Sequence, residues 1–400
     1  MNILITVETL LTGGAETFSL RLAQALSKTN SVVLYRFYAD LIDQDIVSKL
    51  APDVKLVAFS SVFDSLLRKL DSAFIKLKID LSLRNWFIKK DLKRIINKEK
   101  IEVIHSNQFK VDYVVTIVAA KNRIPVVTTI HGDYLQFWHQ PPASLPFYRQ
   151  KLIQCVTKTD FITCISERQL TFFKKEVQPL IPKKISLVKI YNGYPYNPAM
   201  LTNGEESKSK LSIPEDSFIF GMVSRGIPDK GWESAIQAFI ALNASGTHLI
   251  LVGDSPYLSE LKGSYQAYQN IHFVGYAANP LFWISTFNVG LLPSVYASES
   301  LPTVVIEYLF CSKPVIASDV GEIANMLASN TPEAAGMVVP VVKNKVSLEL
   351  LQKAMLRYLQ EPDLYRLHAA HTKSAAAKFD MQTCINLYMQ LYKKNTAAIN

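Results

Sequence analysis

The chain has 400 residues, of which 49% are hydrophobic and 19% are charged. This length exceeds what one hydrophobic core usually serves, so we expect a globular protein of two domains. No stretch approaches the ~20 consecutive apolar residues of a membrane-spanning helix. The N-terminal residues 1–7 lack the basic start and the length of a secretory signal. These features predict a soluble chain in the cytoplasm.

The four cysteines show no CxxC or other spacing that is typical of a metal site. Cys164 and Cys311 lie within apolar runs, which favours ordinary buried thiols and a reducing compartment. The full set is Cys155, Cys164, Cys311 and Cys384.

The net charge of +9 is concentrated in one stretch. Residues 65–100 contain eleven basic and four acidic residues, a net charge of +7, interleaved with large apolar residues that include Trp86. Such a mixture at helical spacing is typical of a helix on an anionic membrane surface. A solvated helix with one buried apolar side gives the same pattern. Nucleic acid is a weaker third alternative, and we expect no such partner because no recognition motif accompanies the charge.

The first half of the chain alternates strands with helices. Apolar runs predict strands, with their polar ends, over residues 2–7, 31–37, 54–59, 103–107, 124–130, 161–165 and 185–190. Helices are predicted after Gly13-Gly14 and over residues 113–120, besides the basic stretch. A strand, a glycine turn and a helix N-terminus form a generic anion cradle. A plain tight turn is the alternative for Gly13 and Gly14, because the sequence is not GxGxxG.

Polar residues follow several of these strands. His105 and His131 each come at a strand end, and Asn192-Gly193 follows the last strand of this half. Open α/β sheets bind ligands just beyond the carboxyl ends of their strands. A lone histidine is more often structural, so its position alone is compatible with either a structural role or ligand binding.

The composition of the chain then changes, and the alternation of strands and helices restarts. Residues 194–214 contain three prolines and a Ser/Lys/Glu cluster, which predicts an interdomain linker. Strands are expected over residues 218–223, 248–252, 271–274, 288–292 and 314–317. Helices are expected over residues 232–242, 303–310, 347–359 and much of 369–394. This βα alternation is typical of doubly wound domains.

Two cations lie in the loop after the strand 218–223. Arg225 and Lys230 are five residues apart across a turn with glycine and proline, and together they could clamp a diphosphate. An ordinary surface loop with two charges is the alternative.

Two carboxylates flank the start of the helix 303–310. Glu299 lies in the loop before it, and Glu307 lies within its apolar residues, where a buried charge needs a partner. Pro302 suits the first turn of a helix. The N–H groups around Leu301 and Thr303 suit a phosphate.

This segment resembles the signature of the retaining, nucleotide-sugar-dependent glycosyltransferases of family four, which have the GT-B fold. The resemblance rests on the span from Glu299 to Glu307, followed by Pro314-Val315-Ile316-Ala317 and Gly321-Glu322. That family more often has Glu-Gly-x-Gly where this chain has Glu299-Ser300-Leu301-Pro302. The departure leaves the spacing of the carboxylates intact but makes the phosphate cradle thinner, because Pro302 supplies no N–H.

The resemblance implies two Rossmann-like α/β domains that face each other across a cleft. Residues 1–195 form an acceptor-side domain and residues 196–375 bind the nucleotide sugar. The final helix, within residues 376–400, packs back on the first domain.

The resemblance also implies roles for individual residues. The catalytic set is Arg225 and Lys230 on the departing diphosphate, Glu299 on hydroxyls of the donor sugar and His131 orienting that sugar. Glu307 accepts hydrogen bonds from the ribose. The remaining donor-binding positions are Gly13, Gly14, Asn192, Gly275, Tyr276, Leu301, Pro302 and Thr303.

These roles predict retaining transfer of a sugar from a nucleotide diphosphate sugar, with a UDP-sugar as working choice, to a hydroxyl of a lipid-linked glycan or a lipopolysaccharide or capsule precursor. No cofactor is implied, and a metal is not required because cations already face the diphosphate. The basic stretch then suggests a peripheral location on the inner face of the cytoplasmic membrane. Paired carboxylates also suit a hydrolase, but both lie on one segment beside a phosphate-like site. The alternatives are a GT-B nucleotide-sugar epimerase and a non-catalytic, membrane-associated assembly partner.

Overall fold

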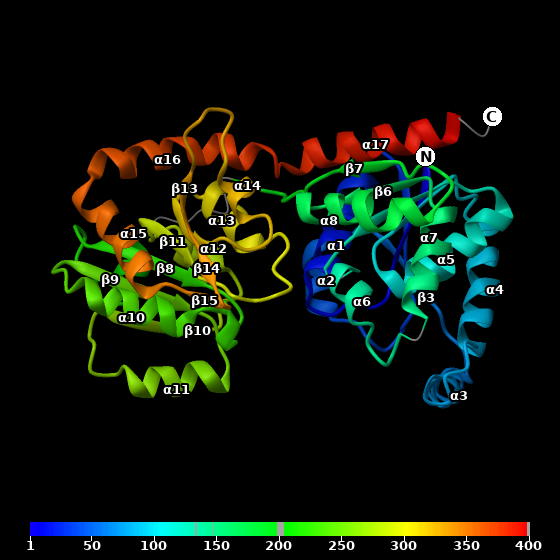
Figure 1. Cartoon of the computed structure of the whole chain (residues 1–400), viewed down its shortest axis with the longest axis horizontal. Coiled ribbons are helices and arrows are strands. Elements are labelled where there is room, and N and C mark those ends of the chain that lie inside the picture. The colour runs from blue at the N-terminus through cyan, green and yellow to red at the C-terminus, as the bar shows by residue number, and fades with distance from the viewer. Residues whose placement is uncertain (133, 146, 198–203, 398–400) are drawn as a thin grey trace. The chain divides into compact units, whose positions relative to one another are not determined.

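The structure, a computed structural model, describes residues 1–132, 134–145, 147–197 and 204–397. The chain forms two compact units: Met1–Pro195 with Met381–Asn400, and Tyr196–Asp380. Each unit is built on a parallel sheet with helices on its faces, so the predicted fold class of two Rossmann-like α/β domains is confirmed (Figure 1).

The first unit contains a seven-stranded sheet in the order β3-β2-β1-β4-β5-β6-β7. Its strands are β1 (Asn2–Val7), β2 (Ser31–Arg36), β3 (Lys55–Ala58), β4 (Val103–Ser106), β5 (Val126–Ile130), β6 (Phe161–Cys164) and β7 (Leu187–Lys189). All neighbours pair in parallel. The central strands read as continuous apolar runs because helices cover both faces of the sheet.

Helices connect these strands. They are α1 (Gly14–Ser27), α2 (Gln44–Leu50), α3 (Asp64–Lys76), α4 (Leu83–Lys98), α5 (Phe109–Asn122), α6 (Tyr134–His139), α7 (Tyr148–Lys158) and α8 (Glu167–Phe172), followed by the short π and 3-10 turns η1 (Phe173–Val177) and η2 (Gln178–Leu180). The basic stretch therefore forms two helices, α3 and α4, and α3 lies at the edge of the unit (Figure 1).

The last helix, α17 (Met381–Ala397), belongs to the first unit, where it contacts α1, β4 and β5. Its polar side chains explain the attachment. The hydroxyl of Tyr392 lies 2.6 Å from Nδ1 of His105, and Nε2 of His105 lies 2.7 Å from Oγ1 of Thr129. The hydroxyl of Tyr388 lies 2.9 Å from the same threonine oxygen. His105, a polar strand-end residue in the sequence, is thus fully buried and holds α17 on the sheet.

The second unit contains a six-stranded parallel sheet in the order β10-β9-β8-β11-β12-β13. The strands are β8 (Phe218–Val223), β9 (Thr247–Val252), β10 (Ile271–Gly275), β11 (Val289–Leu292), β12 (Val315–Ser318) and β13 (Gly336–Val339), with a separate hairpin of β14 (Val341–Val342) and β15 (Lys345–Val346). The helical segments are α9 (Gly204–Lys210), η4 (Pro228–Lys230), α10 (Trp232–Leu242), α11 (Pro256–Ser264), α12 (Pro280–Ile284), α13 (Thr303–Phe310), α14 (Ile323–Leu327), α15 (Leu348–Gln360) and α16 (Pro362–Ala377).

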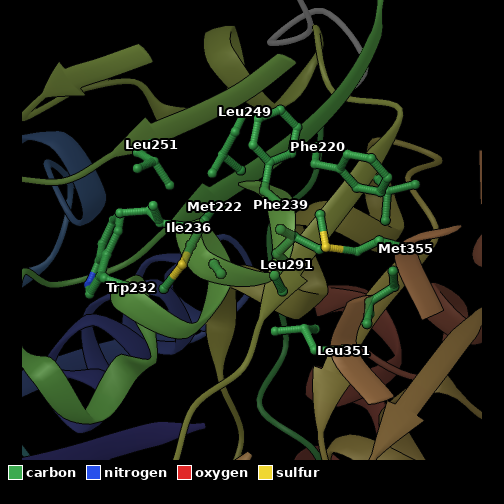
Figure 2. Close-up of a cluster of buried hydrophobic side chains, with 14 of the residues drawn as sticks. Phe220, Met222, Trp232, Ile236, Phe239, Leu249, Leu251, Leu291, Leu351 and Met355 are labelled. Carbon is green, nitrogen blue, oxygen red and sulfur yellow. The ribbon is translucent and has the colours of Figure 1, made fainter. Parts of the chain in front are cut away.

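One face of this sheet carries the main hydrophobic core of the unit. Side chains of β8, β9 and β11 meet those of α10 and α15, as Figure 2 shows. Trp232, Phe220 and Met355 in this cluster are fully buried. Burying each such large apolar side chain stabilises the fold by roughly 1.5–3 kcal/mol. The core therefore holds the carboxyl ends of β8 and β11 in place.

The predicted elements and the observed ones differ in identifiable places. The expected linker 194–214 is helical over α9, where Ser207 is buried and hydrogen-bonds to Thr286; its residues 198–203 lie outside the described residues. Pro302 precedes the helix as the N-cap of α13, with extended backbone, rather than lying in the first turn. The unpredicted edge strand β13 begins at Gly336, whose Cβ would lie 2.1 Å from the carbonyl oxygen of Val315. Only glycine permits that approach of two backbones.

The prediction of buried thiols is confirmed, since all four cysteines are buried and none forms a disulfide within the described residues. Among the described residues, no helix combines the length and the apolar character that crossing a bilayer requires.

We expect Tyr392→Phe to destabilise the first unit. The change removes the hydroxyl that meets Nδ1 of fully buried His105, and an unsatisfied buried polar atom costs about 1–3 kcal/mol. The measurement is the urea midpoint of unfolding. The matched control is Tyr268→Phe, because this tyrosine is 42% exposed. Equal midpoints for both variants would mean that the hydroxyl of Tyr392 does not hold α17.

Candidate functional site

The strand order of the second unit reverses between β8 and β11, since β9 lies on one side of β8 and β11 on the other. In open α/β sheets, ligands bind at the carboxyl end of such a switch point. The loop after β8 carries Arg225 and Lys230, and the loop after β11 carries Glu299. The predicted residues of this unit therefore gather at the edge where chemistry is expected.

The loop after β8 is fixed by two features. Gly231 has φ of +82°, and a Cβ there would lie 2.0 Å from the carbonyl oxygen of Pro293. Only glycine allows both this conformation and this approach to the end of β11. The indole N–H of Trp232 donates to the carbonyl oxygen of Arg225 at 2.9 Å. Since Trp232 is also part of the hydrophobic core, the core orients the backbone that carries Arg225.

Lys230 and Glu299 form a buried ion pair. Nζ of Lys230 lies 2.5 Å from Oε2 of Glu299, and the two residues are 7% and 8% exposed. The hydroxyl of Ser294 donates to the same carboxylate oxygen at 3.0 Å. The sequence predicts both residues as separate contacts of the substrate, and the structure shows that each is also the other's partner.

Backbone hydrogen bonds hold the two loops together around this pair. The N–H of Val295 donates to the carbonyl oxygen of Asp229 at 2.7 Å, and the hydroxyl of Ser294 lies 3.2 Å from that oxygen. The geometry of the ion pair is therefore set by main-chain contacts as well as by charge.

Tyr296 is a site residue that the sequence analysis missed. Its ring centroid lies 4.8 Å from Nζ of Lys230 and 5.5 Å from Cζ of Arg225. An aromatic face attracts cations, so Tyr296 draws both positive groups to one place. Arg225 itself is exposed, and within the described part of the chain no carboxylate forms an ion pair with it. Its guanidinium is available to an anion.

The backbone at Glu299 is braced from the following loop. Gly321 has φ of +60°, and its Cβ would lie 2.0 Å from the carbonyl oxygen of Glu299. The N–H of Glu322 donates to the carbonyl oxygen of Ser300 at 2.9 Å. The pair Gly321-Glu322, which carries part of the family resemblance, thus fixes the peptide that precedes α13.

The N-terminus of α13 lies next to this brace. Pro302 is buried as its N-cap, while Leu301 and Thr303 are half-buried. Glu307 is also half-buried, and its charge contributes to raising the pKa of Tyr308, after the larger effect of burial.

The loop after β10 holds the last predicted positions of this unit. Gly275 has φ of +85° with open space around it, and Tyr276 is 80% exposed. The N–H of Gly253 donates to the carbonyl oxygen of Gly275 at 3.0 Å, which ties the ends of β9 and β10 together.

The first unit has its own switch point between β1 and β4. Gly13 is the extended N-cap of α1, and Gly14 is the first residue of that helix. A Cβ on Gly13 would lie 2.3 Å from Oε2 of Glu16, and Nε2 of Gln108 donates to Oε1 of Glu16 at 2.7 Å. Burial raises the pKa of Glu16. The glycine turn is thus closed by the side chain of Glu16, which is anchored to the segment after β4.

His131 follows β5 in the same unit. Its Nε2 lies 3.3 Å from Oδ1 of fully buried Asn107, and its ring centroid lies 5.3 Å from that of Phe18. Burial lowers the pKa of His131 to about 3, so the imidazole is neutral near pH 7. Both Nδ2 of Asn107 and Oδ1 of Asn192 are buried, and the described residues give neither atom a hydrogen-bond partner.

The structure therefore sorts the predicted residues into separate groups. Arg225, Lys230 and Glu299 meet at one switch point of the second unit, near the start of α13. Gly13, Gly14 and His131 lie around the switch point of the first unit. Within the described residues, no group of three or more His, Cys, Asp or Glu side chains could hold a metal ion, and metal independence stays a prediction.

Comparisons with known proteins match both units. Residues 12–194 match the sequence model described as Glycosyltransferase Family 4, and residues 203–374 match the one described as Glycosyl transferases group 1. Together the two matches extend over most of the chain.

Curated relatives carry related names. The chain is 22% identical over 342 residues to the alpha-monoglucosyldiacylglycerol synthase of Acholeplasma laidlawii, covering 78% of this chain and 81% of that enzyme. It is 25% identical over 257 residues to the UDP-Gal:alpha-D-GlcNAc-diphosphoundecaprenol alpha-1,3-galactosyltransferase of Escherichia coli, covering 59% of this chain and 64% of that enzyme.

A solved structure shares the fold. Anabaena Alr3699/HepE, crystallised in complex with UDP, superposes with a TM-score of 0.72 at 18% identity, covering 98% of this chain and all of that one. This similarity shows that the fold is GT-B.

We expect His131→Asn to flatten the dependence of stability on pH. The unfolded chain takes up a proton at the ordinary pKa of 6.5, whereas folded His131 does so only near 3. Its contribution is therefore fully present above pH 6.5 and is lost as the pH falls toward 3, by about 1.4 kcal/mol per pH unit. Between pH 7.5 and pH 5, urea unfolding should show a loss about 2 kcal/mol smaller in the variant than in the wild type. Parallel pH profiles for the two proteins would refute the lowered pKa of His131 in the folded protein.

Proposed function

Since the chain belongs to the group 1 and family 4 glycosyltransferases, we propose that it moves a sugar, with retention of anomeric configuration, from a nucleotide diphosphate sugar to a hydroxyl of a lipid-linked glycan or a lipopolysaccharide or capsule precursor. It is an enzyme that transfers sugar from a nucleotide sugar. The retention, the UDP donor and the acceptor are our proposals. The observation that carries them is the cluster of Arg225, Lys230, Glu299 and Tyr296 at the switch point of the second unit.

The chemistry of this cluster suits a leaving diphosphate. Negative charge develops on the diphosphate as the bond to the sugar lengthens, and fixed positive groups at that place stabilise the transition state. Arg225 offers an exposed guanidinium that can hold two phosphate oxygens. Lys230 is held by Glu299 through one carboxylate oxygen, so its ammonium is oriented before substrate arrives.

Glu299 has a second carboxylate oxygen beyond the one that meets Lys230 and Ser294. We assign this oxygen to hydroxyls of the donor sugar. Glu307 would accept from the ribose, the N–H groups around Leu301 and Thr303 would face the diphosphate, and Gly275 and Tyr276 would border the base.

In the first unit, neutral His131 would orient the donor sugar, and Gly13, Gly14 and Asn192 would complete the donor contacts. A neutral imidazole can both donate and accept a hydrogen bond, which suits a sugar hydroxyl. No side chain in this set is an activated nucleophile, so we propose that the acceptor hydroxyl attacks the same face from which the diphosphate departs.

The names of relatives support a UDP donor and a lipid acceptor. The Escherichia coli relative is named for UDP-Gal and a diphosphoundecaprenol acceptor, and the Acholeplasma laidlawii relative is a glucosyldiacylglycerol synthase. Anabaena Alr3699/HepE was crystallised with UDP.

The surface of α3 supports a place on the membrane. Apolar side chains are exposed just before α3, on α3, on the segment that joins it to α4 and on α4 itself. The set, which we call the α3 patch, is Val62, Phe63, Leu66, Leu70, Leu77, Ile79, Leu81, Trp86 and Phe87. Lysines and arginines of the basic stretch accompany it. Exposed apolar groups with adjacent cations favour the interface of an anionic bilayer, so we propose a peripheral location on the inner face of the cytoplasmic membrane.

An epimerase of the same fold is the second candidate. It would convert the nucleotide sugar without an acceptor, so product formation that is independent of added acceptor would favour it. The α3 patch favours the transferase with a lipid acceptor, because a free nucleotide sugar gives no reason for an exposed apolar surface.

We expect UDP to raise the melting temperature more than GDP, ADP, CMP or dTDP, and to do so in EDTA because the site provides its own cations.

Arg225→Ala should lower kcat/KM by about 100-fold or more, as loss of one preorganised positive group does. Arg366→Ala, an exposed arginine of α16 that pairs with Asp363, is the control and should keep the activity. A shift that needs added Mg²⁺ would overturn metal independence, and an equal effect of both variants would overturn the role of Arg225.

We expect the protein to float with vesicles that contain phosphatidylglycerol and to stay behind with purely phosphatidylcholine vesicles. The double variant Phe63→Ser/Leu66→Ser should lose most of this binding, because both side chains are more than half exposed in the α3 patch. Leu180→Ser is the control, since Leu180 is 54% exposed outside that patch. Equal flotation with both kinds of vesicle would remove the anionic membrane from the proposal.

A further inference from the structure

A cavity of about 560 Å³ lies within the first unit, apart from the donor-site residues. It is bordered by α3, the segment between α3 and α4, α4, the start of α5, and the residues Ser144, Leu145 and Lys151. Several of its walls are apolar, namely Ile75, Ile79, Leu81, Trp86, Phe109 and Tyr113.

The apolar side of this cavity opens toward the α3 patch. Ile79, Leu81 and Trp86 line the cavity and are themselves 45–51% exposed. They are members of the α3 patch, so apolar surface is continuous from the outside of the unit to the inside of the cavity. An aliphatic chain could follow this surface without crossing a polar barrier.

The cavity is also lined by five cations, and four of them have an acidic partner. Arg68 pairs with Asp40 and Asp64, and Arg84 pairs with Asp64 at 2.8 Å. The other two pairs are Lys110 with Glu8 at 2.7 Å and Lys151 with Asp80 at 2.5 Å. These groups therefore offer little uncompensated charge.

The fifth cation, Lys89, is different. It is half-buried, and the described residues provide it with no ion pair. Burial lowers the pKa of Lys89, and the positive charge of Lys121 lowers it further. A partly desolvated ammonium beside a second cation is stabilised by an anion.

The remaining polar groups do not supply that anion. Three acidic residues line the cavity, and two of them, Glu8 and Asp80, form the ion pairs with Lys110 and Lys151. The third, Asp71, is engaged at the start of α4, where it accepts from the N–H of Leu83 at 2.9 Å and from the hydroxyl of Ser82. The carboxylates on the cavity wall are thus already used, and among the described residues none of them reaches Lys89.

We propose that this cavity binds a phosphate-bearing amphiphile, with the phosphate against Lys89 and the aliphatic part along Ile75, Ile79 and Trp86. This assignment rests on the proposed function, because we identify the amphiphile with the lipid end of the acceptor or with a lipid of the bilayer beneath the α3 patch. Both sources share the chemistry of a phosphate ester joined to an aliphatic chain.

The test is calorimetric titration of the full-length protein with dihexanoyl phosphatidic acid, kept below its micelle concentration and without nucleotide sugar. Dihexanoyl phosphatidylcholine and glycerol 3-phosphate are the comparison ligands. We expect the phosphatidic acid to bind at least tenfold more tightly than either, because only this lipid supplies both the aliphatic chains and an uncompensated phosphate charge.

Lys89→Gln should weaken this binding at least tenfold. Lys93→Gln is the matched control: Lys93 lies one turn further along α4, is exposed and does not line the cavity. Its affinity should stay within twofold of the wild type. Ile75→Ser is a second cavity variant that keeps every charge, and it should weaken the lipid but not glycerol 3-phosphate. Affinities are compared only among variants whose melting temperatures match that of the wild type.

Equal weakening by Lys89→Gln and Lys93→Gln would overturn the proposal, because it would reduce the effect to general surface charge. Equal affinities for phosphatidic acid and glycerol 3-phosphate would overturn it as well. Because no donor or turnover enters the titration, a failure here leaves the UDP shift and the activity to be judged separately. If binding is confirmed, weaker flotation of Lys89→Gln than of Lys93→Gln assigns the cavity to a bilayer lipid, and equal flotation assigns it to the acceptor.

Discussion

The ion pair between Lys230 and Glu299 is the constraint on which the site of the second unit depends. Two opposite charges buried together gain little net stability, because desolvation offsets most of their attraction. Removing one of them is costly, about 3–5 kcal/mol, since the other is left uncompensated. The pair therefore acts less as a source of stability than as a fixed distance between the loops after β8 and β11. Ser294 and the carbonyl of Asp229 complete that attachment.

This constraint connects the hydrophobic core to the chemistry. Trp232 lies in the core and donates to the carbonyl of Arg225, while Lys230, two residues earlier, is held by Glu299. The loop is thus anchored at both of its functional positions, and Tyr296 brings an aromatic face to both cations. Arg225 is left exposed at the end of an otherwise rigid arrangement. A positive group held in this way needs little reorganisation when negative charge develops nearby, which is the condition for electrostatic catalysis.

How far the sequence predicts this arrangement depends on the range of each interaction. The strands over residues 2–7 and 218–223 and the helices over 232–242 and 303–310 match to the residue, because local periodicity and the apolar runs define them. The pairing of Lys230 with Glu299 could not be predicted, since 69 residues separate the partners and only the parallel order of β8 and β11 brings them together. Tyr296 was missed for the same reason. The edge strand β13 and the helix α9 carry weak local signals, and tertiary contacts of Gly336 and Ser207 decide them.

The basic stretch shows why a count of charges is a poor guide to function. Its excess of +7 suggests a surface that is uniformly positive, yet Arg68 and Arg84 are neutralised by Asp40 and Asp64. These arginines also lie over the ring of Tyr38, at 4.7 and 4.1 Å from its centroid, and they serve to attach α3 and α4 to the sheet. The charge that remains available is therefore smaller and more localised than the sequence indicates. The apolar part of the stretch, by contrast, stays exposed at the surface, and Ile79, Leu81 and Trp86 extend it into the cavity.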